Sequence, residues 1–153
     1  MTTTNKFIVG TRTSLAYNGT DLSTLAAGTY VKNTTAYNCA TNQPVDVVVD
    51  VVAATTNTPS GNKRLVVFLK ESLDGTNFRS GPESGTTATR ENNLLLLGVI
   101  PITTASTTEE GTFSVLGALQ YVPNSFYIVI KNDLGVALTS GTVFTSEISS
   151  TNG

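Results

Sequence analysis

Asp46 and Asp50 are the two carboxylates whose spacing comes closest to that of a catalytic pair. They lie in a valine-rich run, and on a strand both would occupy one face with their backbones about 13 Å apart. Glycoside hydrolysis needs carboxyl groups roughly 5–9.5 Å apart. Side chains that lean inwards would shorten the gap, but a solvated strand face is the simpler interpretation of this pair.

Two further acidic motifs also fit structural roles better than chemical ones. Glu109 and Glu110 are adjacent in a Thr-rich stretch and are typical of exposed loop surface. Residues 74–77, Asp-Gly-Thr-Asn, are similar to part of a calcium loop but lack the alternating oxygen ligands and distal glutamate of an EF-hand, so they predict a turn. The chain has no histidine, the commonest general base and metal ligand near neutral pH. We therefore expect no enzyme, no cofactor and no metal site.

Charge and cysteine content bear on the kind of partner. The chain has 9 Lys and Arg against 11 Asp and Glu, a net charge of -2, and Lys63-Arg64 is its one adjacent basic pair. Binding to nucleic-acid phosphates needs clustered cations, so we expect no nucleic-acid partner. Cys39 is the single cysteine and predicts a small buried apolar side chain rather than an intramolecular disulfide.

The apolar stretches are short for a membrane span. The longest, Leu94–Ile102, contains Gly98 and Pro101 and reaches about half the length that a spanning helix needs. The first ten residues lack the apolar core of a secretory signal. We therefore expect synthesis in a cytoplasm and no membrane partner.

Alternating valines give the clearest structural signal. Over residues 44–54, every second residue from Val45 to Val51 is a valine on one strand face, and the opposite face is half polar. Such β-branched residues fit a pleated sheet better than a helix. Residues 63–71 alternate in the same way. A short polar loop joins the two runs, so we expect them to pair as a hairpin.

Later segments predict further strands separated by turn residues. Residues 94–102 are apolar on both faces, so this strand is either buried on both sides or supplies a subunit contact. Residues 112–122 and 126–130 predict two more strands. The turn at 132–135 predicts a hairpin with the last segment of the chain.

About eight strands with turn signals between them predict an all-β fold. The best description is a two-sheet antiparallel β-sandwich, a jelly roll, in a single domain over residues 9–153. Residues 1–8 begin with a polar run without strand or helix periodicity and predict a flexible N-terminal arm.

The segment 45–78 carries a family resemblance. The valine-rich strand leads to Arg64-Leu-Val-Val-Phe-Leu69 and then to Glu71-Ser-Leu-Asp-Gly-Thr-Asn-Phe78. A strand followed by Glu-Ser-x-Asp-Gly-x-x-aromatic resembles the jelly-roll head decoration, or cement, proteins of tailed bacteriophages. The resemblance implies a virion protein, made in the host cytoplasm, that binds the major capsid protein on the outer capsid surface and stabilises the phage head.

The resemblance also implies a homo-oligomer, for which we favour a trimer over a dimer. The candidate capsid or self-contact residues are Phe7, Ile8, Leu94, Leu96, Ile100 and Ile102. Deleting residues 1–8 should weaken capsid attachment and leave the domain folded. The alternative function is a receptor- or carbohydrate-binding module of a phage tail or fibre, for which Tyr127 offers an aromatic side chain on the face opposite Phe126.

Overall fold

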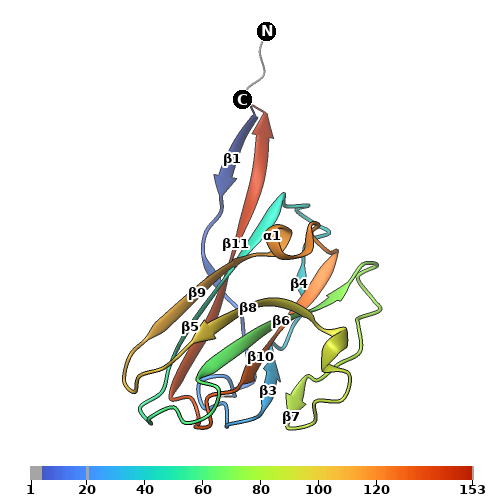
Figure 1. The fold of residues 1–153 in the computed structure, drawn as a ribbon. Coiled ribbons are helices and arrows are strands. Elements are labelled where there is room, and N and C mark those ends of the chain that lie inside the picture. Colours follow the sequence, from blue (N-terminus) through green and yellow to red (C-terminus); the bar gives the residue numbers. More distant parts are fainter. Residues whose placement is uncertain (1–4, 20, 153) are drawn as a thin grey trace.

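The computed structural model describes residues 5–19 and 21–152 and consists almost entirely of β-strands (Figure 1). The strands are β1 (Asn5–Val9), β2 (Thr13–Ser14), β3 (Tyr30–Lys32), β4 (Tyr37–Asn38), β5 (Asp46–Ala54), β6 (Arg64–Ser72), β7 (Ser84–Gly85), β8 (Leu95–Pro101), β9 (Glu109–Ser114), β10 (Ser125–Asn132) and β11 (Ser140–Asn152). The helical segments are the 3-10 turn η1 (Glu91–Asn93) and the helix α1 (Val115–Leu119).

The strands form two antiparallel sheets. The first sheet has the order β1-β11-β5-β9, with β2 also paired to β11; the second has the order β7-β3-β10-β6-β8, with β4 also paired to β10. Without the short strands β2, β4 and β7, the order is 1-11-5-9 in one sheet and 3-10-6-8 in the other, which is the strand order of a jelly roll. The predicted jelly-roll β-sandwich is confirmed, and the short strands account for the count above eight.

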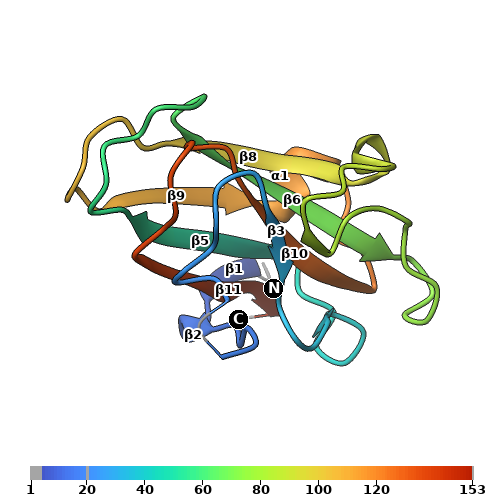
Figure 2. The ribbon, with the colours of Figure 1, turned by 90° about the horizontal axis from the view of Figure 1, so that it is seen from below.

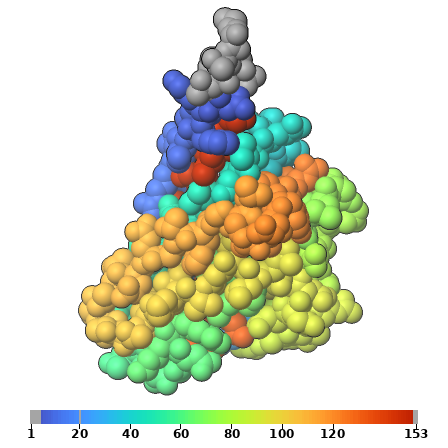
Figure 3. Space-filling model, turned by 45° about the horizontal axis from the view of Figure 1, so that its top comes forward, coloured from blue at the N-terminus to red at the C-terminus, as the bar shows by residue number. Residues whose placement is uncertain are grey.

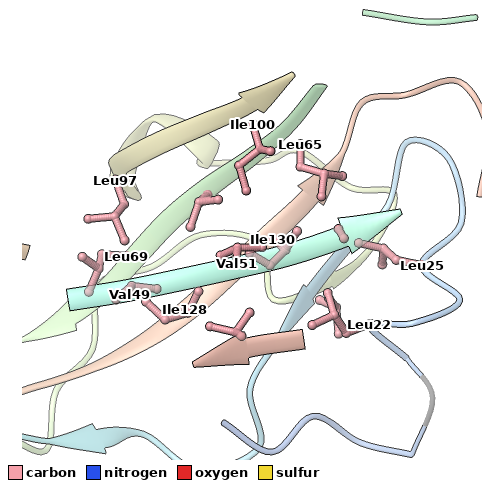
Figure 4. Close-up of a cluster of buried hydrophobic side chains, with 14 of the residues drawn as sticks. Leu22, Leu25, Val49, Val51, Leu65, Leu69, Leu97, Ile100, Ile128 and Ile130 are labelled. Carbon is pink, nitrogen blue, oxygen red and sulfur yellow. The ribbon is translucent and has the colours of Figure 1, made fainter. Parts of the chain in front are cut away.

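The main core lies between the two sheets, where the valine alternation predicted it. Val47, Val49 and Val51 of β5 are fully buried in the same cluster as Leu65 and Leu69 of β6. Figure 4 shows Val49 and Val51 facing Leu65 and Leu69 across the sandwich. On the opposite face of β5, Val48, Asp50, Val52 and Ala54 keep partial exposure, whereas Asp46 at the start of the strand is buried. The two-residue period of the sequence therefore assigned the buried face of this strand correctly.

Two predicted hairpins are instead connections between the sheets. β5 and β6 belong to different sheets, as do β10 and β11, so residues 55–63 and 133–139 each cross the end of the sandwich. The crossings touch at Gly61 and Gly135, where a Cβ on Gly135 would lie 2.4 Å from the Gly61 nitrogen. A strand with a strongly apolar face must bury that face against another layer. Placing consecutive strands in opposite sheets achieves this burial, which explains why the two loops are connections between sheets and not hairpins.

The predicted strand 112–122 is also corrected, because it ends at Ser114 and a helix follows. The Ser114 hydroxyl accepts the Gly117 amide at 2.7 Å, and the Asp46 carboxylate accepts the Leu116 amide at 2.8 Å. Two acceptors at the free amides of the first turn favour a helix start. The Asp46 contact comes from a distant strand and is not visible in the local sequence.

The predicted N-terminal arm is described from Asn5 onward, and residues 1–4 lie outside the described residues. Residues 5–9 form β1, which is hydrogen-bonded along β11 rather than free. Gly10 and the two residues after it separate β1 from β2, and both strands pair with the same edge of β11.

Candidate protein-binding surface

The most exposed apolar feature is a two-stranded ribbon, formed by β1 and residues 148–152 of β11. Pairing between β5 and β11 ends at Ile148, whereas β1 continues along β11 as far as Asn152. The ribbon therefore projects beyond the sandwich, as the blue and red strands at the top of Figures 1 and 3 show. An isolated two-stranded ribbon is only marginally stable in water, so a projecting one gains from contact with a partner.

Both faces of the ribbon carry exposed apolar side chains. Phe7 and Val9 are 67% and 66% exposed and share one face, with Ile148 opposite Val9. Ile8 is 51% exposed and lies on the other face. Next to Ile148, Val45 adds a 37% exposed side chain and donates its amide to the Ile148 carbonyl at 2.7 Å. Contiguous apolar surface of this kind marks a protein-interaction site more often than free surface.

An arginine fixes the root of the ribbon to the outer face of the first sheet. Arg12 lies over the Phe144 ring of β11 at 3.9 Å from its centroid. Its Nε lies 3.1 Å from the Asp50 carboxylate of β5, and its Nη2 lies 2.8 Å from Glu110 of β9. The planar guanidinium thus links β11, β5 and β9 at once, which a lysine with its single ammonium group would not do. This contact holds the segment between β1 and β2 in place.

The outer face of the second sheet, in contrast, is covered by the protein itself. Residues 79–94 run across it and bury a second apolar cluster of Tyr30, Val66, Phe68, Leu94 and Val129. Glu83 fastens this segment to Lys32, at 2.7 Å, and to Lys70. Glu91 accepts the Lys131 ammonium at 2.8 Å and the Tyr30 hydroxyl. The face most open to a partner is therefore that of the first sheet, continuous with the ribbon.

Ion pairing at this covering segment changes the acidity of both glutamates. Burial opposes ionisation of Glu83, but hydrogen bonds and charge from Lys32 and Lys70 outweigh it and lower its pKa below the usual value. Burial likewise opposes ionisation of Glu91, whose pKa is lowered overall by hydrogen bonds from Lys131 and Tyr30. Both carboxylates are thus held in their charged form by the sheet beneath them.

The structure divides the six predicted contact residues between surface and core. Phe7, Ile8 and Leu96 are exposed, Leu96 at 55%. Leu94, Ile100 and Ile102 are buried within the chain, so they cannot form a contact surface and this part of the prediction is corrected.

A β-bulge in β8 explains the correction. Val67 pairs with Gly98 and Phe68 pairs with Leu96, so Leu97 is an extra residue. An extra residue reverses the alternation of side chains, and both Leu97 and Ile100 consequently face the core. β8 also lies beside β9 at the edge of the sandwich (Figure 2).

The acidic motifs hold the structure together. Asp46 is buried, not solvated as predicted, because its carboxylate accepts the Ser114 hydroxyl at 2.6 Å as well as the Leu116 amide. Asp50 is paired with Arg12. Asp74 forms the predicted turn: its carboxylate accepts main-chain amides of the turn, and those hydrogen bonds lower its pKa well below the usual value.

The five tyrosines, all within the described residues, do not gather into an aromatic platform. Tyr127 is half-buried between the Phe78 ring, 4.8 Å away, and the Lys32 ammonium, 4.1 Å away. Tyr121 is the most exposed at 38%, and its hydroxyl donates to Glu71 at 2.5 Å. Sugar binding by stacking needs an open aromatic face, and these contacts do not favour the glycan-binding alternative.

Comparisons with known proteins do not assign a function, so the proposal below is argued from the exposed surface of the molecule. No protein-family model and no curated protein matches the sequence. Within residues 5–19 and 21–152, no three His, Cys, Asp or Glu side chains are grouped to hold a metal ion. In the same described part, no helix has the length and apolar character needed to cross a bilayer.

Proposed function

We propose that the protein is a virion structural protein that binds the major capsid protein on the outer surface of a phage head and stabilises the shell. One observation carries this proposal: the projecting ribbon exposes Phe7, Ile8 and Val9, with two of them about two-thirds exposed. Apolar side chains on an edge strand are a liability for a free protein. They are expected where a partner covers them.

The location on a phage head is supported by the segment that carries the family resemblance. Its strand is β6, and the Asp-Gly part of its motif forms the turn held by Asp74 at the end of that strand. The jelly-roll order of the sheets agrees with the fold that the resemblance implies. Attachment through a ribbon would leave the sandwich outside the shell, as a decoration protein requires.

The test is co-sedimentation of the purified protein with empty phage heads. We expect the wild-type protein to sediment with heads and the double variant Phe7→Thr with Val9→Thr to be lost from them. Burial of an apolar side chain contributes about 1.5–3 kcal/mol, so removing two corresponds to roughly a 100-fold or larger loss of affinity. Threonine keeps the strand propensity of β1.

A matched control removes apolar surface elsewhere. Leu73→Thr with Val99→Thr changes two exposed apolar side chains that lie outside the ribbon, and this variant should bind as the wild type does. Failure of the wild-type protein to sediment with heads would rule out capsid attachment. Equal binding of the two double variants would rule out the ribbon as the site.

A further inference from the structure

Among the residues that the structure describes, nothing pairs with the outer edge of β1, and its main-chain groups follow a defined pattern. The Gly10 amide donates to the Glu147 carbonyl at 2.7 Å, which sets the phase of the β1–β11 ladder. In an antiparallel ladder the residues alternate between those that bond the neighbouring strand and those whose amide and carbonyl point away. β1 is the last strand of its sheet. The residues that point away from β11 are Asn5, Phe7 and Val9.

We propose that this edge pairs with the same edge of a second copy of the chain, antiparallel and about a twofold axis at Phe7, which gives a dimer in place of the trimer expected from the sequence. In this register Phe7 faces the partner subunit's Phe7, and Asn5 faces the partner subunit's Val9. Each of these pairs consists of residues whose amides and carbonyls point outward, so all of them exchange main-chain hydrogen bonds. The register uses the whole of β1, and it satisfies the edge without any change in the β1–β11 ladder.

Charge supports the same register. Lys6 is the one charged residue of β1, and the proposed axis places it opposite the partner subunit's Ile8. Moving the axis to Lys6 would set two like charges directly opposite each other, which is destabilising. The proposed axis also brings the two Phe7 rings side by side on one face, where an aromatic pair adds stabilisation.

Pairing also resolves the marginal stability of the projecting ribbon. Two ribbons joined at β1 form a four-stranded layer, which exceeds the three strands with an apolar face that independent stability needs. The apolar face that carries Phe7 and Val9 is doubled and stays open, so it remains available to a capsid. The inference therefore goes beyond the proposed function and does not depend on it.

Analytical ultracentrifugation without capsids tests the pairing. We expect the wild-type protein to approach twice its 16.0 kDa mass as its concentration rises. Val9→Pro removes an amide that points outward and keeps Phe7 and Ile8. Because of the twofold symmetry each dimer loses two main-chain hydrogen bonds, so the dissociation constant of the dimer should rise about tenfold or more. Val99→Thr, which leaves the edge intact, should dimerise as the wild type does. A wild-type protein that stays monomeric at every concentration overturns the proposal.

Disulfide trapping tests the register and does not depend on the proline variant. Lys6 and the partner subunit's Ile8 would form a non-hydrogen-bonded pair with Cα atoms about 4.5 Å apart, within disulfide range. Lys6→Cys together with Ile8→Cys should give a covalent dimer under mild oxidation, and Ile8→Cys alone should not. A covalent dimer from Ile8→Cys alone, with none from the double variant, would overturn the register.

These measurements separate the two proposals. A monomer that sediments with heads overturns the twofold pairing and leaves capsid attachment standing. A dimer that fails to sediment with heads supports the pairing and removes the capsid role. If β1 instead paired with a strand of the capsid protein, the wild-type protein would be a monomer in solution and its Val9→Pro variant would no longer sediment with heads. That result would also overturn the inference.

Discussion

Asn132 is a fully buried side chain whose replacement should destabilise the fold more than its size suggests. It ends β10, next to the crossing that leads into β11. Its Nδ2 donates to the carbonyls of Leu25, at 2.7 Å, and Val136, at 2.8 Å. Its Oδ1 accepts the Leu134 amide at 2.9 Å. One amide side chain thus fixes the turn before β3 and the crossing loop to the end of one strand.

Asn132→Ala leaves an amide and two carbonyls without these partners inside the protein. Each unsatisfied buried group costs about 1–3 kcal/mol, and partial relaxation recovers some of it, so we expect a loss of about 3–5 kcal/mol in the free energy of unfolding. The measurement is urea unfolding followed by far-UV circular dichroism. With a slope near 2 kcal/mol/M the midpoint should fall by roughly 2 M.

The control is Asn62→Ala, which removes an amide of the same chemistry at the surface. Asn62 donates to the Asp133 carboxylate at 2.7 Å but is exposed, so we expect a change within about 0.5 kcal/mol. Asn132→Asp keeps the shape but turns a carboxylate oxygen towards two carbonyls, and it should be at least as destabilising as alanine. A loss below about 1 kcal/mol for Asn132→Ala would refute the reasoning.

Three further predictions follow from single contacts. The pKa values of Glu83 and Glu91 are lowered in the folded protein, so their contribution to stability is complete above the ordinary value of 4.5 and is lost as the pH falls through the lower folded-state values. Hydrogen exchange should show residues 79–94 opening first in acid. Substitution of both glutamates by glutamine should make this opening depend less on pH. Gly98→Ala would place a Cβ 2.0 Å from an aromatic ring of β9, and thermal unfolding should show a loss of about 1–3 kcal/mol. Burial, with a smaller effect of a nearby carboxylate, raises the pKa of Cys39 to about 12, so a thiol reagent should label it at neutral pH only as the protein unfolds.

The sequence predicted the sandwich well because its strands follow the two-residue period. The valines of β5 face the core as their spacing required. The connections were less predictable, because a polar loop such as 55–63 can turn back within one sheet or cross to the other. That choice depends on which partner strand covers each apolar face, and it is settled by the whole fold rather than by the loop.

Of the six predicted contact residues, three are exposed and three are buried. Here too the outcome depends on how a strand pairs in the whole fold and not on its own sequence. A strand that is apolar on both faces predicts burial on both sides or a contact, and the bulge at Leu97 turns Leu97 and Ile100 towards the core while Leu96 and Val99 stay exposed. The bulge depends on pairing with β6, so the sequence of β8 alone cannot show it. Arg12 was missed because its partners Asp50, Glu110 and Phe144 come from three distant strands.

The ribbon shows how strand length alone can create an exposed apolar surface. β11 has 13 residues and β5 has 9, so β11 outruns its neighbour and carries β1 away from the core. Residues 149–151 of the extension are Ser, Ser and Thr, whereas β1 supplies Phe7, Ile8 and Val9. Polar side chains on one strand and apolar ones on its partner would be a poor design for a buried hairpin. They suit a ribbon in which β11 provides a polar support and β1 carries the exposed apolar side chains, which is why both proposals place the contact on β1.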